Sequence, residues 1–305
     1  MVSRCVRPYA TDAFLFVREL KAMHRKKVRA RIIWSVIGIV ILILGWFSFG
    51  PSPNNQASKT VTVGVVGQTK QGEQIWHQVA RTAKQKYGIT VVVKNFSDYN
   101  QPNKALKTGD IDLNAFQHYA FLDAWKKANH GGVVPIGRTT ISPIRLYSKK
   151  YKKLADLPDG ATIAVPNDAT NESRALYVLK NAGLIKLKHG GALATIADIS
   201  SNPRQLQIKE ISAEQTGRVI KSVAAAVVNN DFAGPAGLTD KNALYIEPVN
   251  KDSQQWINII AAKKDRRKNR LYRDVVKAYQ TKQVAKLLHK FYGRPTIPAW
   301  NLKIK

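Results

Sequence analysis

The sequence predicts an α/β protein with mainly parallel sheets, preceded by one helix that spans a membrane. Three observations lead to this class. Apolar runs typical of strands alternate with amphipathic runs of helical period along most of the 305 residues. Eighteen residues without a charge, IIWSVIGIVILILGWFSF, occupy positions 32–49, close to the roughly 20 apolar residues that cross a bilayer. The rest, residues 51–305, suffices for one large domain or two smaller lobes.

The apolar run divides the chain into two compartments. Nine Lys and Arg residues precede it, and none follows it until Lys59. Because a basic flank stays in the cytoplasm, we expect residues 1–31 to be a basic cytoplasmic segment and residues 32–50 to be a single-pass anchor in the cell membrane. Everything after it is then expected on the extracytoplasmic face. Residues 51–60, PSPNNQASKT, read as a polar linker.

An uncleaved signal anchor fits the run better than a cleaved signal peptide. Trp46, Phe47 and Phe49 stand where a cleavage site needs small residues. A lipoprotein would need a cysteine just after the run, and the only cysteine, Cys5, precedes it. Two alternatives stay open: cleavage near residues 56–58, and a start at Met23, which opens the compact basic stretch MHRKKVRAR.

Strands and helices are expected to alternate from residue 61 onward. Short runs rich in Val, Ile and Ala predict buried strands, and apolar residues spaced three or four apart predict helices. Strands are expected at 61–66, 89–96, 111–114, 162–165, 224–228 and 255–261. Helices are expected at 73–87, 102–108, 117–128, 173–182, 213–221, 270–281 and 283–291.

The composition argues against nucleic-acid binding and against enzyme chemistry. Residues 51–305 carry 40 Lys and Arg against 18 Asp and Glu, but the charges are scattered and no nucleic-acid motif accompanies them. Outside the N-terminal segment there is no cysteine, no G-x-S-x-G elbow and no phosphate loop, and the histidines at 77, 118, 130 and 189 lack the spacing of metal ligands. We therefore expect no catalysis, cofactor or metal.

Aromatic, amide and guanidinium side chains instead gather at the ends of the expected strands. In open α/β sheets, ligands bind beyond the carboxyl ends of the strands. Aromatic rings would enclose an apolar side chain there, while Arg and Asn would hold a carboxylate and an ammonium group. The candidates that follow a strand in this way are Tyr99, Phe116, His118, Phe121, Asn171, Arg174 and Asn229.

Single candidates also have simpler explanations. Tyr99 and Phe116 are equally compatible with a place in the core, and Asn171 with a role as the N-cap of the helix that carries Arg174. The joint pattern is what favours a ligand site.

Four stretches of the chain resemble the NlpA lipoprotein family, the substrate-binding proteins of methionine-uptake ABC transporters. They are FSDYNQPNKAL at 96–106, GDIDLNAFQHYAFLDAW at 109–125, YSKKYKKLADLPDGATIAVPNDATNESRAL at 147–176 and AAAVVNNDFAGPAGL at 224–238. The resemblance covers essentially all of residues 60–300. It implies a two-lobed periplasmic-binding-protein fold of type II, with lobe 1 formed by residues 60–140 plus 247–305 and lobe 2 by residues 141–246. The lobes would close on the ligand like a hinged trap.

The resemblance also assigns roles to the candidate residues. Tyr99, Phe116, His118 and Phe121 would form a cage around a methionine side chain. The family commonly has Pro-Tyr where this chain has Ala120 and Phe121, so the cage would be more apolar here.

The polar candidates would hold the amino-acid part of the ligand. Arg174 would pair with the ligand carboxylate, and Asn171 and Asn229 would hydrogen-bond its backbone. An ABC permease and its ATPase would be the partners, and the N-terminal helix would attach the receptor to the membrane. Alternatives left open are D-methionine, a methionine-containing dipeptide, another amino acid, or a surface adhesion protein that binds polyanions.

Overall fold

The computed structural model describes residue 35 and residues 59–188, 193–292 and 296–302. The compact unit that contains the described elements spans Lys59–Lys305. The basic segment 1–31, the anchor 32–50 except Ser35, and most of the linker lie outside the described residues. Within the described ranges, no helix is long and apolar enough to cross a membrane.

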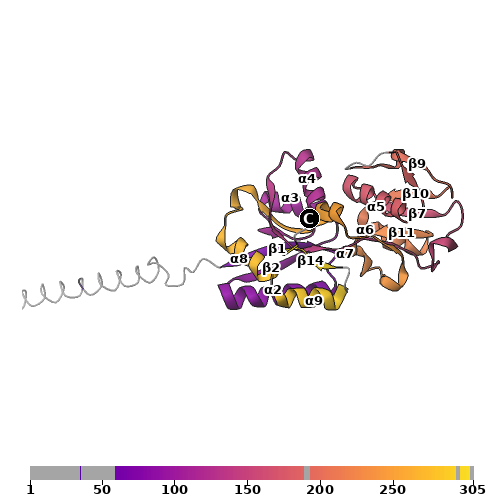
Figure 1. Cartoon of the computed structure of the whole chain (residues 1–305). Coiled ribbons are helices and arrows are strands. Elements are labelled where there is room, and N and C mark those ends of the chain that lie inside the picture. Colours follow the sequence, from indigo (N-terminus) through magenta and orange to yellow (C-terminus); the bar gives the residue numbers. More distant parts are fainter. Residues whose placement is uncertain (1–34, 36–58, 189–192, 293–295, 303–305) are drawn as a thin grey trace, which may run out of the picture. The chain divides into compact units, whose positions relative to one another are not determined.

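Two five-stranded sheets organise the chain, each flanked by helices (Figure 1). The strands are β1 (Thr60–Val66), β2 (Thr90–Phe96), β3 (Leu113–Asn114), β4 (Val133–Arg138), β5 (Thr140–Ile141), β6 (Arg145–Tyr147), β7 (Thr162–Pro166), β8 (Lys186–Leu187), β9 (Ile199–Ser201), β10 (Gln207–Ile211), β11 (Ala225–Val228), β12 (Ala243–Ile246), β13 (Ile259–Lys263) and β14 (Ile297–Pro298). The α-helices are α2 (Lys70–Tyr87), α3 (Gln101–Thr108), α4 (Tyr119–Ala128), α5 (Ala169–Asn181), α6 (Ala213–Thr216), α7 (Asn230–Ala233), α8 (Arg270–Tyr279) and α9 (Lys282–Tyr292). The short 3-10 helices are η1 (Leu154–Asp156), η2 (Ile196–Asp198), η3 (Arg218–Lys221), η4 (Asp240–Asn242), η5 (Lys251–Trp256) and η6 (Lys264–Arg266).

The first sheet has the strand order β2-β1-β3-β13-β4. β1 reads TVTVGVV, and its valines are buried because helices cover both faces of the sheet. Val61, Val63 and Val65 pack with α2, α8 and α9, whereas Val66 packs on the side of α3 and α4. Figure 1 shows α2 and α9 side by side under this sheet. We call this body, with its helices, the first lobe.

The second sheet has the order β10-β7-β11-β6-β12, and we call its body the second lobe. Its core forms around Ile163, Val165 and Val227 with the inner face of α5. The chain passes between the sheets twice, through residues 139–144 and through residues 247–258. Both passages lie next to the candidate site residues.

The prediction of mainly parallel sheets is only half right. In each five-stranded sheet two neighbouring pairings are parallel, and the two pairings on the other side are antiparallel. The antiparallel strands are β13 in the first sheet and β6 in the second. Each follows directly after a passage from the other lobe, and not after a strand and helix of its own sheet. The alternation of strand and helix patterns predicts parallel neighbours and does not show where a strand arrives from the other lobe.

Most expected elements differ from the structure by a few residues at one end, and three of them differ more. The strand expected at 255–261 is η5 up to Trp256 followed by β13, because Ser253 closes a turn with the backbone of Asn250. The helix expected at 173–182 already begins at Ala169, where the carboxylate of Asp168 accepts the Asn171 N–H and caps it. The region 213–221 divides into α6 and η3.

Candidate functional site

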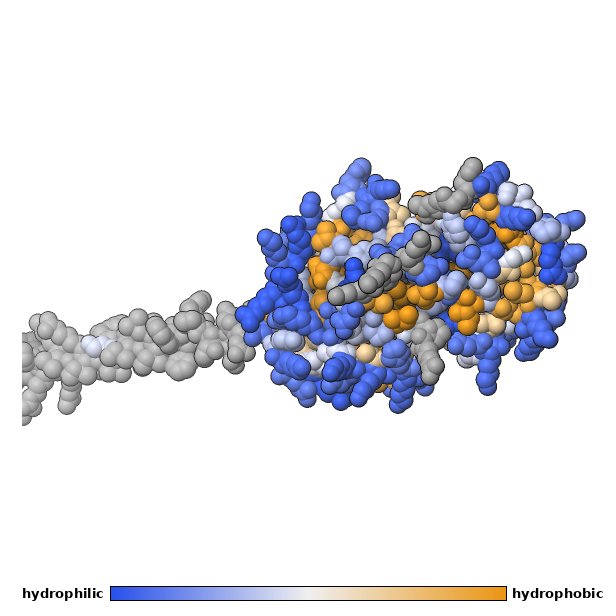
Figure 2. Space-filling model, viewed as in Figure 1, coloured by the Kyte–Doolittle hydropathy of each residue, from blue (hydrophilic) through white to orange (hydrophobic). Residues whose placement is uncertain are grey.

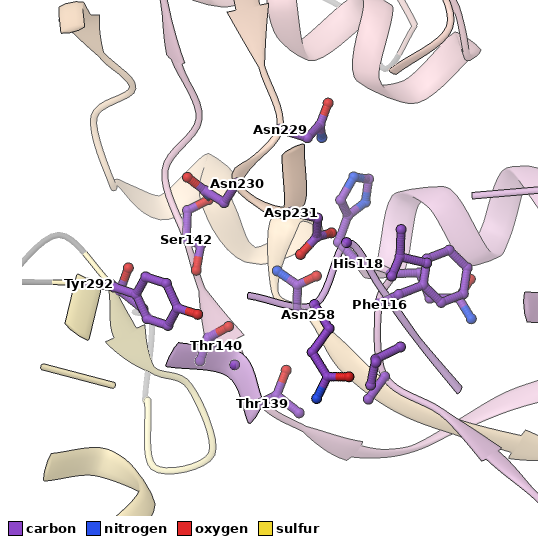
Figure 3. A pocket seen from close by; sticks show the side chains of 18 of the residues that line it. Phe116, His118, Thr139, Thr140, Ser142, Asn229, Asn230, Asp231, Asn258 and Tyr292 are labelled. Atoms are coloured by element: carbon purple, nitrogen blue, oxygen red, sulfur yellow. The ribbon is translucent and has the colours of Figure 1, made fainter. Parts of the chain in front are cut away.

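The seven candidate residues all line one cavity of about 170 Å³ between the two lobes. This volume lies below the roughly 300–1,000 Å³ of pockets for drug-sized ligands, which favours a ligand as small as one amino acid. The first lobe contributes Tyr99, Phe116, His118 and Phe121, and the second contributes Asn171, Arg174 and Asn229. Figure 3 shows Asn229, Asn230 and Asp231 leaving the end of β11 beside His118 and Phe116, with Tyr292 across from them.

An aromatic cluster forms one wall of the cavity. The ring of Tyr99 lies 5.7 Å from Phe116, 5.8 Å from Phe121 and 5.0 Å from Phe232 between ring centroids. Phe116 and Phe121 meet edge to face at 5.7 Å, an arrangement that aromatic pairs prefer. Tyr99 and Phe116 also belong to the hydrophobic core, so the simpler explanation of these two residues as core residues is confirmed.

Buried amides hold the loop that presents this wall. Asn103, Asn114 and Gln117 are at most 2% exposed and bond to one another: Gln117 donates to the Asn103 and Asn114 oxygens at 2.7 and 2.9 Å, and Asn103 donates to Gln117 at 2.8 Å. A fully satisfied buried network of this kind rigidifies its surroundings. Phe116 and His118, on either side of Gln117, are thereby fixed in place.

Asn171 is the centre of the polar wall. Its side-chain Nδ2 donates to both carboxylate oxygens of Asp168 at 3.0 Å, and its Oδ1 accepts from Asn229 Nδ2 at 2.8 Å. His118 Nε2 also lies 3.3 Å from this Oδ1, across the gap between the lobes. Asp168, not Asn171, is the helix cap, so the capping explanation of Asn171 is wrong. Among the described residues, the buried Oδ1 of Asn229 has no hydrogen-bond partner, which leaves an acceptor for a ligand.

His118 enters this network as a neutral ring. Burial, followed by the nearby charge of Arg174, lowers the pKa of His118 to about 3. Its Nδ1 accepts the Phe121 N–H at 3.1 Å, which assigns the proton to Nε2 and makes that atom the donor toward Asn171. The site therefore carries no histidine charge at neutral pH.

Arg174 already has a carboxylate partner within the protein. Its Nε and Nη2 bond to the two oxygens of Glu247 at 2.8 and 2.5 Å, and Nη2 also donates to the Ser142 carbonyl. The pair is almost wholly buried, with the side chain of Glu247 11% exposed. The ring of Trp256 lies 4.9 Å from the guanidinium carbon. Nη1 makes no hydrogen bond to a described residue.

Asp231 is a site residue that the sequence analysis missed. Its Oδ2 accepts the Tyr99 hydroxyl at 2.8 Å, which joins the second lobe to the first. Burial raises the pKa of Asp231 to about 6 and also raises that of Tyr99, which has the carboxylate as neighbour. Asp231 directly follows Asn229 and Asn230 beyond strand β11, so its position at a strand end was a usable signal.

Other missed residues gave no local signal. Thr139, Thr140 and Ser142 line the cavity from the first passage between the lobes, and Tyr292 lines it from the end of α9. Trp256 was expected in a strand, but it supports both Arg174 and His118, with a ring distance of 4.9 Å to the latter. No group of three or more His, Cys, Asp or Glu residues placed to hold a metal occurs in the described part of the chain.

Known proteins share this architecture. The profile of the NlpA lipoprotein family matches residues 61–300. The D-methionine-binding lipoprotein MetQ of Escherichia coli O157:H7 is 40% identical over 244 residues, which are 79% of this chain and 88% of that protein.

Two solved structures extend the comparison. The substrate binding protein of a methionine transporter from Streptococcus pneumoniae is 46% identical, with a TM-score of 0.75 over 79% of this chain and 96% of its own. A nutrient binding protein from Burkholderia cenocepacia, solved bound to methionine, is 40% identical, with a TM-score of 0.73 over 78% of this chain and 99% of its own.

Proposed function

Because the chain belongs to the NlpA lipoprotein family, we propose that it is the substrate-binding protein of an ABC importer and that its ligand is methionine. Proteins named for methionine binding or methionine transport are 40% and 46% identical to it over most of its length. The one observation that carries the choice of ligand is the division of the cavity into an aromatic wall and a polar wall.

Each wall suits one part of the amino acid. Tyr99, Phe116 and Phe121 offer aromatic faces and edges, with which a thioether sulfur makes favourable contacts. On the opposite side, Nη1 of Arg174 would bind the ligand carboxylate, and the free Oδ1 of Asn229 would accept from its ammonium group. Asn171 would hold Asn229 and His118 in register for that contact.

Closure of the two lobes would enclose the ligand between them. We assign residues 60–140 plus 247–305 to one lobe and residues 141–246 to the other, with the two passages between the sheets as hinges. The closed, liganded form would dock on the permease, and the ATPase of the transporter would supply the energy. The binding domain would lie on the extracytoplasmic face, with residues 32–50 as its membrane anchor.

A thermal-shift screen of the full chain against free amino acids and short peptides tests the proposal. Methionine at 100 times its dissociation constant is expected to stabilise the fold by about 2.7 kcal/mol. A shift with D-methionine, a methionine dipeptide or another amino acid, and none with L-methionine, would correct the ligand and keep the receptor class. A chain that responds to none of them, or that turns a ligand over, would contradict the class.

A further inference from the structure

The end of the first sheet opposite the cavity carries a dense group of exposed cations. β1, β2 and β3 run parallel, so their carboxyl ends all face the cavity and their amino ends all face away from it. β13 runs antiparallel to them and therefore brings Lys263 to the far end, where it pairs with Val133. The residues that follow β13 form an exposed loop at that end.

This loop is almost purely basic. Between β13 and the second turn of α8, the exposed charged residues are Lys264, Arg266, Arg267, Lys268, Arg270 and Arg273, against the single exposed acid Asp265. Among the described residues, only Arg270 of these six forms an ion pair, with Asp274 at 3.8 Å. We call these six residues the basic loop. Neither the cavity nor the contacts between the lobes use them.

Neighbouring helices add charge of the same sign at the same end. α2, α3 and α4 each end at the amino side of the strand that follows, and their last turns carry exposed Lys84, Lys86, Lys107 and Lys127. Lys264 N–H bonds to the Gly132 carbonyl at 2.9 Å, which ties the basic loop to the turn after α4. Figure 2 shows hydrophilic side chains covering the end of the lobe where Figure 1 places α8.

The chain also enters the folded body at this end. Lys59 directly precedes β1, and its carbonyl accepts the Thr90 N–H at the amino end of β2. The uncharged run at 32–49 therefore connects to the basic end of the domain through ten linker residues. Ten residues span at most about 35 Å even when fully extended. The linker is thus joined to the domain at its basic end.

We propose that the basic loop is a docking surface for the anionic headgroups of the membrane in which the N-terminal segment is anchored. The inference rests on the proposed membrane attachment. Cations beside a membrane anchor are attracted to anionic lipids within about one Debye length, roughly 10 Å, and the linker permits that approach.

The test uses the full chain in nanodiscs of phosphatidylcholine alone or of equal parts phosphatidylcholine and phosphatidylglycerol. A fluorophore on Gln85→Cys, in a Cys5→Ser background, reports on this end of the domain through quenching by headgroup-labelled lipid. Gln85 is exposed between Lys84 and Lys86. We expect quenching that is at least roughly twofold stronger with phosphatidylglycerol and that is lost at high salt.

Charge-reversal variants distinguish an effect of the basic loop from an effect of the protein's overall net charge. Lys264→Glu/Arg267→Glu/Lys268→Glu is expected to abolish the lipid-dependent quenching; Arg266 is left in place because it contacts Tyr272. The matched control, Lys150→Glu/Lys152→Glu/Lys153→Glu, changes the same charge on exposed residues of the second lobe and should leave it intact. The methionine-induced thermal shift, measured on the same samples, shows that both variants fold and tests the receptor function separately.

Three results would overturn the assignment. They are equal quenching in the two lipid mixtures, equal losses in the two triple variants, and a chain that does not stay in the nanodisc. Binding of a soluble polyanion such as heparin without lipid-dependent quenching would assign the loop to a polymer instead. None of these results would change the methionine response, so failure of the lipid contact and failure of the receptor function are distinguishable.

Discussion

At the scale of single residues, the position of Arg174 combines binding with stability. The sequence and the family resemblance both predict that this arginine pairs with a ligand carboxylate. The structure adds Glu247, which lies 73 positions away and already bonds Nε and Nη2. No local pattern could have predicted a partner so distant in the sequence. The guanidinium is thereby held by the protein before any ligand arrives.

Arg174→Ala is therefore expected to damage both properties. Loss of the pair with the ligand carboxylate should weaken binding by about 2–5 kcal/mol. The free energy of unfolding should fall by about 3–5 kcal/mol, because Glu247 stays behind as a buried, unpaired charge. Urea denaturation and ligand titration measure the two effects.

A double variant separates the two effects. Arg174→Ala/Glu247→Ala should recover much of the unfolding free energy but none of the affinity. As a control, Lys126→Ala breaks an exposed pair with Asp123 and should cost no more than about 1 kcal/mol. Unchanged affinity in Arg174→Ala would show that the ligand carboxylate is held elsewhere.

Asp231 gives the site a dependence on pH. Its pKa is raised from 3.8 to about 6 in the folded protein, so the stability contributed by its protonated form is complete below about 3.8 and is lost as the pH rises through about 6. Asp231→Asn keeps a side-chain oxygen that accepts the Tyr99 hydroxyl. Because asparagine stays neutral, the variant does not lose stability as the pH rises. We expect the variant to exceed the wild type in unfolding free energy by about 1–3 kcal/mol at about pH 7.5 and by little at about pH 4.

Chemical denaturation over that pH range is the measurement. His118 does not interfere, since its pKa of about 3 keeps it neutral throughout. A difference between variant and wild type that is the same at both ends of the range would contradict the raised pKa.

At the scale of elements, two glycines let the lobes meet. The loop between β1 and α2 faces α7 of the other lobe, and a side chain on either partner would collide. A Cβ at Gly67 would lie 2.3 Å from the Asp231 carbonyl oxygen, and a Cβ at Gly234 would lie 2.8 Å from the Thr69 methyl group. Both collisions would occur only when the lobes are close together, so a side chain at either position would destabilise the closed form.

Gly234→Ala is expected to weaken ligand binding by opposing closure. Gly234 has a helical φ of −59°, so alanine adds no backbone strain there. Overpacking costs about 1–3 kcal/mol, which corresponds to roughly 5- to 150-fold in the dissociation constant. Calorimetric titration measures it, with the unfolding free energy of each ligand-free variant measured alongside.

Two further variants control the result. Gly72→Ala adds a methyl group near the same loop but meets nothing closer than 3.6 Å, so it should not oppose closure of the lobes. Thr69→Ser removes the colliding methyl group and keeps the hydroxyl that accepts the Gly72 N–H. Gly234→Ala/Thr69→Ser should therefore regain affinity; failure to do so would mean that Gly234 acts in some other way.

The elements show where prediction from sequence works. Strands such as β1 and helices such as α2 are evident because their apolar patterns are long and local. The antiparallel direction of β6 and β13 is not evident from the sequence, since it depends on how the chain passes between the lobes. The strand expected at 255–261 was wrong at its start because a side-chain-closed turn overrode the apolar pattern.

At the scale of the whole molecule, the family assignment agrees with the resemblance that the motifs predicted. Position at strand ends brought all seven candidates to one cavity. The same reasoning could have found Asp231, which also follows the end of β11, but not Tyr292, which reaches the cavity from the end of α9. A residue that reaches a site from a separate layer of the fold leaves no trace in the local pattern.

Isothermal titration calorimetry of the full chain with L-methionine decides whether one methionine binds between the lobes. We predict saturable heat with one site per chain, and loss of most of that affinity in Arg174→Ala. Absence of heat with L-methionine, together with one-site binding of a different amino acid or a dipeptide, would contradict the assignment of methionine as the ligand.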